Sequence, residues 1–544
     1  MVAAATPAPD VAGRGQLARR AGLVSAGVFA SRILGLVREQ TFAVLFGAGR
    51  ELDAFVTAFR IPNLMRDLFA EGALSSAFVP TFTAVRTKDG EEAAWTLARR
   101  VMSVLLVLLG VLSLLIFLFA PAIMHVYAAG FSPEKLDLAI RMTRVLSPFL
   151  LAVALASVAM GVLNTFGRFF VPALAPASLN VAAILGMIAL PPVLALGGWH
   201  PGLSLAIGAM VGGVLQFGVQ LPGLYALGFR FRWDWRPKDP GVVRIAKLML
   251  PATIGQAATQ INFLVDTWLA SRYGNGPITW LSLAFRLIQL PIGLFGVALG
   301  MANLARVSRD AAQGDREGLR TNLASALRAA ALLALPATAG LVALREPIIR
   351  LLFQHGRFDA HSTQRTAAAL LCYALGLYAY AVTKIQVPTF YALGDTRLPV
   401  IGSTSAVAAK LAANGLFVMI LPAVGIDPFL GLALSTSIAA WTNFSILGIG
   451  LRSRAGALTG RGVVRATVSM AVLSLIMGVG CHALHAGLSR VLPGEDVLRA
   501  ALKLAVAVVA GGAITLAGAH LLGVPEARDI ARRIGAVAKR GRRA

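Results

Sequence analysis

Two long apolar segments near the start of the chain, at about 21–47 and 53–85, contain charged residues that membrane-spanning helices seldom carry. These residues are Arg32, Arg38, Asp53, Arg60, Arg66, Asp67 and Glu71. A charge at mid-bilayer depth costs at least about 2.5–3.5 kcal/mol, so helices surrounded by lipid could not hold this many. Arginine suits phosphate oxygens because its planar guanidinium can donate two parallel hydrogen bonds. We therefore predict that these side chains face a watery cavity, a partner charge or an anionic cargo.

Two further cations, Arg286 and Lys384, lie in apolar segments of the second half of the chain. The alternative for most of the cations is an internal ion pair: Arg32 or Arg38 with Asp53, Arg66 with Asp67 or Glu71, and Arg286 with Asp266. The cations nevertheless outnumber the acids at membrane depth. That surplus favours a binding surface for an anionic cargo.

A second candidate site involves Asp266, the sole acid of an apolar segment at about 248–271. A lone intramembrane carboxylate suggests a site for a monovalent cation or proton, or a counter-ion for a nearby cation. Lys410 and Asn414 lie one helical turn apart in another apolar segment, at about 398–422. We expect Lys410 to pair with Asp266 and Asn414 to belong to the same ion-coupling or charge-pair site.

The composition is that of a polytopic membrane protein. Of the 544 residues, 57% are hydrophobic and 14% are charged, whereas a soluble protein carries roughly 25% charged residues. Spans of about 20 residues each would cross the bilayer about fourteen times. The 50 Lys and Arg against 25 Asp and Glu gather in alternate short loops. This pattern follows the positive-inside rule, so we predict two cytoplasmic termini and no nucleic-acid partner.

Motifs for enzyme chemistry or metal binding are not recognisable in the sequence. Cys372 and Cys481 both fall in predicted spans, so they indicate neither a disulfide framework nor a zinc ribbon. We find no Walker loop, nucleophile elbow or zincin motif. The apolar segment after the N-terminal tail is followed by arginines rather than a cleavage site, so no removable signal peptide is expected. The chain is therefore predicted to be a transporter rather than an enzyme, without a metal or an organic cofactor.

An internal repeat sets the predicted architecture. The segment 163–172 resembles 391–399, and 202–205 resembles 431–434, at an offset of roughly 227–229 residues in both places. Duplication of six spans gives two lobes of the same orientation, an arrangement in which cargo binds between the halves. We predict an all-α fold of two pseudo-symmetric six-helix lobes plus two extra helices. The predicted parts are a tail at 1–20, a lobe at 21–229, a basic linker at 230–247, a lobe at 248–451, the extra helices at 452–522 and a basic tail at 523–544.

The motifs that carry these charges resemble the MurJ (MviN) family of lipid II flippases. The resemblance covers essentially the whole chain and rests on Ser31-Arg32-Ile33-Leu34-Gly35-Leu36-Val37-Arg38, Asp53-Ala54-Phe55, Ile61-Pro62-Asn63-Leu64, Phe69-Ala70-Glu71-Gly72-Ala73 and Phe353-Gln354-His355-Gly356-Arg357-Phe358. It implies export of undecaprenyl-pyrophosphoryl-disaccharide-pentapeptide across the bacterial cytoplasmic (inner) membrane for peptidoglycan and cell-wall synthesis. Alternating access is the implied mechanism, and the extra helices are candidates for a lipid-tail groove.

The resemblance also implies roles for individual residues. Family arginines of the central cavity correspond to Arg32, Arg38 and Arg286, and a family acid corresponds to Asp53. Some members bind sodium where Asp266 lies, but Lys410 stands where a neutral or acidic ligand is expected. We therefore predict coupling to membrane potential or a proton instead of sodium. The alternatives are export of another polyprenyl-linked oligosaccharide or of a drug, and cell-wall synthesis proteins are candidate partners.

Overall fold

The structure is a computed structural model that describes residues 11–69, 73–455, 462–494 and 496–528. Within those ranges the secondary structure is helical and contains no strand, which confirms the predicted all-α class. The helices form two compact units, unit 1 (Met1–Gly276) and unit 2 (Pro277–Ala544). Each unit has its own buried apolar core.

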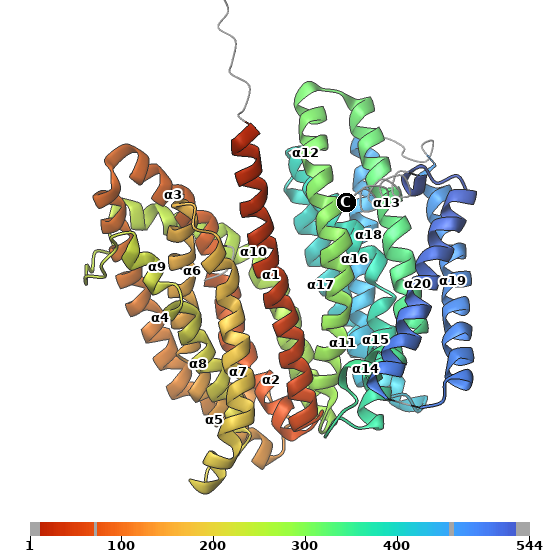
Figure 1. Cartoon of the computed structure of the whole chain (residues 1–544), viewed down its shortest axis with the longest axis horizontal. Coiled ribbons are helices and arrows are strands. Elements are labelled where there is room, and N and C mark those ends of the chain that lie inside the picture. The colour runs from red at the N-terminus through yellow and green to blue at the C-terminus, as the bar shows by residue number, and fades with distance from the viewer. Residues whose placement is uncertain (1–10, 70–72, 456–461, 495, 529–544) are drawn as a thin grey trace, which may run out of the picture. The chain divides into compact units, whose positions relative to one another are not determined.

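Unit 1 contains ten α-helices in the described part of the chain (Figure 1). They are α1 (Val11–Phe46), α2 (Arg50–Phe69), α3 (Ala73–Asp89), α4 (Glu91–Tyr127), α5 (Pro133–Leu146), α6 (Phe149–Thr165), α7 (Phe170–Leu196), α8 (Leu203–Gly218), α9 (Leu221–Ala226) and α10 (Pro240–Ala270), and a 3₁₀ turn (Ser271–Tyr273) follows α10.

Aromatic stacking joins three helices at one end of the unit 1 core. Trp95 of α4 stacks on Phe166, which follows α6, with ring centroids 5.0 Å apart. The guanidinium of Arg86 from α3 lies 3.7 Å from the centroid of the Phe166 ring. A cation over an aromatic face is attracted by the ring's quadrupole, so this stack ties α3 to α4 and α6.

Unit 2 also contains ten α-helices in its described residues. They are α11 (Pro277–Pro291), α12 (Ala298–Gln313), α13 (Arg316–Ala343), α14 (Arg345–Phe353), α15 (Ala360–Ala374), α16 (Leu377–Ala392), α17 (Arg397–Ala423), α18 (Phe429–Ala455), α19 (Val463–Val491) and α20 (Val497–Leu521), and a π-helical segment (Ile292–Val297) joins α11 to α12. Figure 1 shows α19 and α20 side by side in blue, and both pack against α13.

Ten described helices or helix pairs are long and apolar enough to cross a membrane, and the bent pair α15–α16 makes up to eleven. The predicted count of fourteen is thus not confirmed. The helices α1, α2, α3 and α10 are not among the ten, and α2 alone carries Asp53, Arg60, Arg66 and Asp67 in 20 residues. Among the ten, Pro133–Thr165 combines α5 and α6, and Pro277–Gln313 combines α11, the π-helical segment and α12.

The predicted repeat recurs in the backbone of two helix ends. Gly167 after α6 and Gly394 after α16 have φ angles of 71° and 74°, values at which a side chain would be strained. The amide of Arg168 donates to Leu163 O at 2.9 Å, and that of Asp395 donates to Phe390 O at the same distance. Both turns are therefore Schellman-type ends. Each leads into a helix of 27 residues, α7 or α17, that packs against the next helix, α8 or α18.

The position of α10 differs from the predicted organisation. We assigned residues from 248 onward to the second lobe, but α10 packs against α2, α3 and α4 of unit 1. The compact units are defined by packing, whereas the predicted lobes were defined by the repeat. The lobe limits at 229, 247, 451 and 522 therefore stay a prediction.

Candidate functional site

Arg32 lies on α1, next to the part of this helix that packs against α7. The side-chain amide of Asn180 in α7 donates to Ser31 O at 3.1 Å. A Cβ added at Gly27 would lie 3.4 Å from the Cβ of Ala173, so the two helices pack closely at the preceding turn. The Arg32 side chain is exposed, which leaves its guanidinium available to a ligand.

Arg38 is paired with an acid that our sequence analysis overlooked. Its Nη2 donates to Glu39 Oε1 at 2.7 Å, with 14% and 9% of the two side chains exposed. The guanidinium also lies 5.5 Å from the ring centroid of Phe42. Its Nε–H is buried without an acceptor among the described residues. Arg38 is thus held in place by Glu39 and retains one buried donor for an incoming anion.

Asp53 forms a buried ion pair at the start of α2. Its side chain is 0% exposed, and its Oδ2 accepts from Lys135 Nζ of α5 at 2.8 Å and from the amide of Gly276 at 2.7 Å. Lys135 donates a further hydrogen bond to Gly274 O at 3.0 Å. The pair with Lys135 of α5 is an additional contact beside the alternative considered for Asp53, pairing with Arg32 or Arg38, which stays untested.

The second half of α2 rests on α10 through two polar contacts. The Arg60 guanidinium lies 4.7 Å from the ring centroid of Phe263. Arg66 pairs with Asp67 at 2.9 Å, which is one of the two alternatives considered for it in the sequence. Asp67 in turn accepts a hydrogen bond from the side-chain amide of Gln260 at 3.1 Å. Both arginines are half-buried. Glu71, the other acid considered for Arg66, lies outside the described residues.

Arg286 and Lys384 belong to unit 2, and both side chains are exposed. Arg286 lies on α11, six residues before the π-helical segment that begins at Ile292, a type of distortion that is frequent at functional sites. Lys384 lies on α16, against which the π-helical segment and α12 pack through glycines. A Cβ at Gly296 would come 3.1 Å from Ala381 Cα, and one at Gly300 would overlap the carbonyl oxygen of Lys384. The two glycines therefore set the position of Lys384 by close backbone packing.

The predicted ion-coupling residues are placed in separate units. Asp266 is half-buried on α10 of unit 1. Lys410 and Asn414 are 3% and 2% exposed on α17 of unit 2, and Ser435 of α18 donates a hydrogen bond to Asn414 Oδ1. The pairing of Lys410 with Asp266 stays a prediction.

Glu39 and Lys135 were missed although the sequence contains a signal for each. Glu39 precedes the buried Phe42, Ala43 and Phe46 at the helical spacings i, i+3, i+4 and i+7. Lys135 stands in the same relation to the buried Leu138, Ala139 and Met142. A charged residue on an apolar helical stripe must be buried with a partner. Applying that rule to both stripes would have found the two residues.

The site residues therefore fall into two groups. Arg32, Arg286 and Lys384 present exposed cations that can bind phosphate or carboxylate oxygens. Asp53 and Arg60 make contacts that link α2 to α5 and to α10, whereas Arg38 and Arg66 pair with the acids next to them in sequence, Glu39 and Asp67. Each unit thus carries exposed cations of a kind that can bind an anionic group without covalent chemistry.

Comparison with known proteins agrees with that chemistry. The family model described as "Lipid II flippase MurJ" matches residues 42–500. The chain is 36% identical over 465 residues to the lipid II flippase MurJ of Burkholderia cenocepacia, covering 84% of this chain and 88% of that protein. It is 35% identical over 438 residues to a probable lipid II flippase MurJ of Vibrio cholerae, covering 79% and 82%.

Solved structures show the same relationship. A structure described as lipid II flippase MurJ in an inward closed conformation aligns with a TM-score of 0.74 at 26% identity, covering 92% of this chain and 99% of that one. An inward-facing multidrug resistance MATE family transporter of the MOP superfamily aligns with a TM-score of 0.63 at 17% identity, covering 79% and 96%, and shares the fold. With a family model matched over most of its length and close full-length relatives, the chain belongs to the MurJ family of lipid II flippases.

Proposed function

We propose that this protein is a lipid II flippase. It moves the undecaprenyl-pyrophosphate-linked peptidoglycan precursor from the cytoplasmic to the outer leaflet of the bacterial cytoplasmic membrane by alternating access. The protein is a transporter and not an enzyme, and the cargo leaves chemically unchanged. Its activity supplies peptidoglycan synthesis, so proteins of cell-wall synthesis are candidate partners.

The observation that best supports this cargo is the state of Arg38. Its Nη2 is bound to Glu39, while its buried Nε–H has no acceptor in the described part of the chain. A buried donor without a partner costs about 1–3 kcal/mol, which a phosphate oxygen would recover. The exposed Arg32 and Arg286 offer further guanidinium groups. Pyrophosphate and peptide carboxylates are the anionic groups of lipid II that such donors would bind.

The orientation follows from the loops. Arg86, Lys88, Arg99 and Arg100 lie around the α3–α4 turn, and six cations lie between Arg230 and Lys247. These segments would face the cytoplasm, as would both termini. Cargo would then load from the cytoplasmic side and leave on the outer side.

The two final helices would hold the isoprenoid tail. They pack together and against α13, and α14 also contacts α20. Their outer surfaces present exposed apolar side chains, including Val472, Leu475 and Val509. A polyprenyl chain lying along this surface would stay in the bilayer while the head group moves.

Lys410 would replace a coupling ion. An ammonium buried beside Asn414 supplies a positive charge where related proteins are expected to bind sodium. We therefore infer that transport is driven by membrane potential or a proton and needs no sodium, metal or organic cofactor.

Complementation tests the proposal directly. Cells depleted of their own flippase would receive wild type, Arg38→Ala, Arg286→Ala or the control Arg141→Ala, whose exposed side chain pairs with Asp137. We expect wild type and Arg141→Ala to restore outward-facing lipid II, and the other two, although expressed and folded, to fail. If folded wild type fails to restore lipid II but restores another polyprenyl-linked glycan, the cargo is that glycan.

A further inference from the structure

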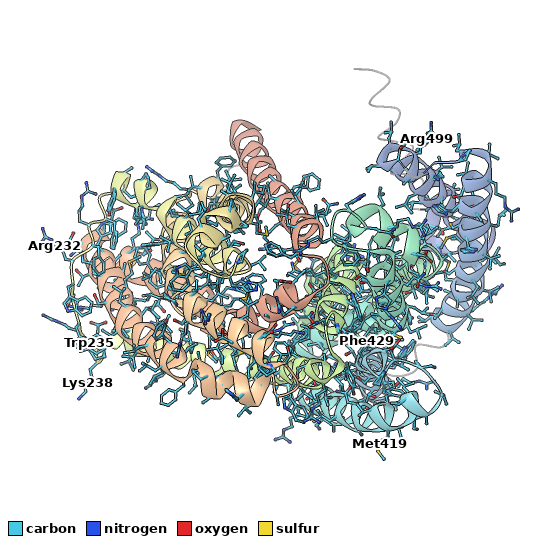
Figure 2. The ribbon with its side chains drawn as sticks, turned by 90° about the horizontal axis from the view of Figure 1, so that it is seen from below. Arg232, Trp235, Lys238, Met419, Phe429 and Arg499 are labelled. Atoms are coloured by element: carbon cyan, nitrogen blue, oxygen red, sulfur yellow. The ribbon has the colours of Figure 1, made fainter. Side chains whose placement is uncertain are left out.

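The linker between α9 and α10 alternates aromatic and cationic residues. Phe231, Trp233 and Trp235 are 43%, 60% and 44% exposed, and the cations among them are Arg230, Arg232, Arg236 and Lys238. Figure 2 shows Arg232, Trp235 and Lys238 at the outer edge of unit 1, directed away from its helices. Arg232 and Lys238 make no ion pair or hydrogen bond within the described part of the chain.

The linker is fixed to α4 rather than loosely attached. Arg99 donates to Arg230 O at 3.1 Å, and Ser103 accepts from the amide of Asp234 at 3.1 Å. Arg100 binds the carboxylate of Asp234 at 2.9 Å and also that of Asp239. Asp239 in addition caps α10 by accepting from the amide of Gly241 at 2.9 Å.

These contacts decide the charge that the linker presents. Arg100 of α4 pairs with both linker carboxylates, and Asp234 also forms an ion pair with Arg236 at 3.2 Å. The charges of Arg232 and Lys238 are therefore uncompensated and point outward. Exposed tryptophans beside such cations are typical of the membrane–water interface.

An apolar groove begins next to this anchored linker. It lies between α3, α4 and α10, encloses about 190 Å³, and is lined by residues including Val101, Leu105, Leu108, Ile245, Met249 and Leu250. Thr253 is the single polar residue of the lining. An apolar cavity of about 150 Å³ is large enough to hold benzene, so this groove can take part of a hydrocarbon chain. Val101 of the lining directly follows Arg100, so one end of the groove lies next to the ion pairs that Arg100 forms with the linker.

We propose that the linker and the groove together form a binding site for an anionic phospholipid of the inner leaflet. The phosphate would bind Arg232 and Lys238, Trp233 and Trp235 would lie at head-group depth, and one acyl chain would occupy the groove. Basic clusters directly beside a spanning helix attract anionic lipids, and this one is positioned by fixed contacts. The proposal goes beyond transport of lipid II and shares with it only the cytoplasmic placement of the linker.

Tryptophan quenching can test the site on the purified full-length protein. Vesicles would contain phosphatidylglycerol with brominated acyl chains, or phosphatidylcholine with the same chains. We expect the brominated phosphatidylglycerol to quench more, and the extra quenching to disappear in Trp233→Phe/Trp235→Phe. The Arg232→Gln/Lys238→Gln variant should need about tenfold more phosphatidylglycerol for the same effect. A matched control, Arg490→Gln/Arg499→Gln, removes two cations elsewhere on the surface and should behave as wild type.

A second variant tests the groove independently of charge. Ala246→Phe would fill the groove and should reduce quenching by brominated phosphatidylglycerol without changing the number of cations. Equal quenching by the two brominated lipids would overturn the proposal. Displacement of phosphatidylglycerol by trace undecaprenyl phosphate would also overturn it, because the groove would then belong to the isoprenoid cargo. Complementation with the same variants separates loss of this site from loss of transport.

Discussion

The carboxylate of Asp53 and the ammonium of Lys135 are 2.8 Å apart with 0% and 2% of their side chains exposed. The pair joins α2 to α5, Lys135 also donates to Gly274 O, and Asp53 also accepts from the amide of Gly276. Gly276 is the last residue of unit 1. Asp53 therefore holds the segment that leads into unit 2, and we infer that it acts by positioning that segment rather than by touching cargo.

Removing one partner of this pair should be more damaging than removing both. Lys135→Met leaves a buried carboxylate without its cation, which typically costs 3–5 kcal/mol. Asp53→Asn/Lys135→Met removes both charges and should recover much of the thermal stability. Thermal unfolding in detergent measures the difference, with Asp137→Asn, an exposed acid of the same helix, as control. Equal destabilisation by the single and double variants would contradict a coupled pair.

Close packing of α12 on α16 predicts that Gly300 is intolerant of any side chain. Gly300→Ala would place a Cβ against the carbonyl oxygen of Lys384 and force the helices apart. We expect lower melting temperature and loss of complementation. The control is Gly415→Ala on α17, where no atom lies within 4 Å of an added Cβ, and where alanine should raise helix stability by up to about 1 kcal/mol. A Gly300→Ala variant with unchanged melting temperature and complementation would contradict the prediction, because the two helices would then separate at little cost.

Sodium should not stabilise this protein if Lys410 replaces the ion. We expect the melting temperature of wild type to be the same in sodium and potassium chloride. Lys410→Ala removes the ammonium and should create a sodium-dependent rise in melting temperature that requires Asp266. Sodium stabilisation of wild type that survives Lys410→Ala and is lost in Asp266→Ala would contradict the prediction.

Asp359 gives a pH-dependent test outside the spans. Its Oδ1 accepts from the amide of Ser362 at 2.8 Å, and this hydrogen bond holds the pKa of Asp359 below its ordinary value. A lowered folded-state pKa stabilises the protein above the unfolded value of about 3.9, and this contribution disappears as the pH falls through the folded pKa. Asp359→Ala should therefore cost about 1 kcal/mol at pH 7 by loss of the α15 cap. The difference in melting temperature between wild type and Asp359→Ala should become smaller in acid. A difference that does not change with pH would contradict a role of the ionised Asp359 as helix cap.

The sequence was sufficient to predict the helical class and the family because both depend on local patterns. Apolar segments, the repeat around Gly167 and Gly394, and the motif from Ser31 to Arg38 are all readable along the chain. Ion-pair partners depend on which helices pack together, and that information is not local. Asp53 was noticed but its partner Lys135, 82 positions later, was not. The predicted span count is not confirmed for a related reason, since helices such as α2 and α10 pack against other helices and need not be uniformly apolar.

The stack of Arg86, Phe166 and Trp95 gives unit 1 an optical reporter of its own. Trp95 is 5% exposed in unit 1, whereas Trp280, 7% exposed, lies against Phe429 in unit 2. Indole emission shifts to longer wavelength when the ring meets water, so retaining one of these tryptophans at a time would report the melting of each unit separately. Such spectra would show whether the two units unfold in one cooperative transition or in two successive ones.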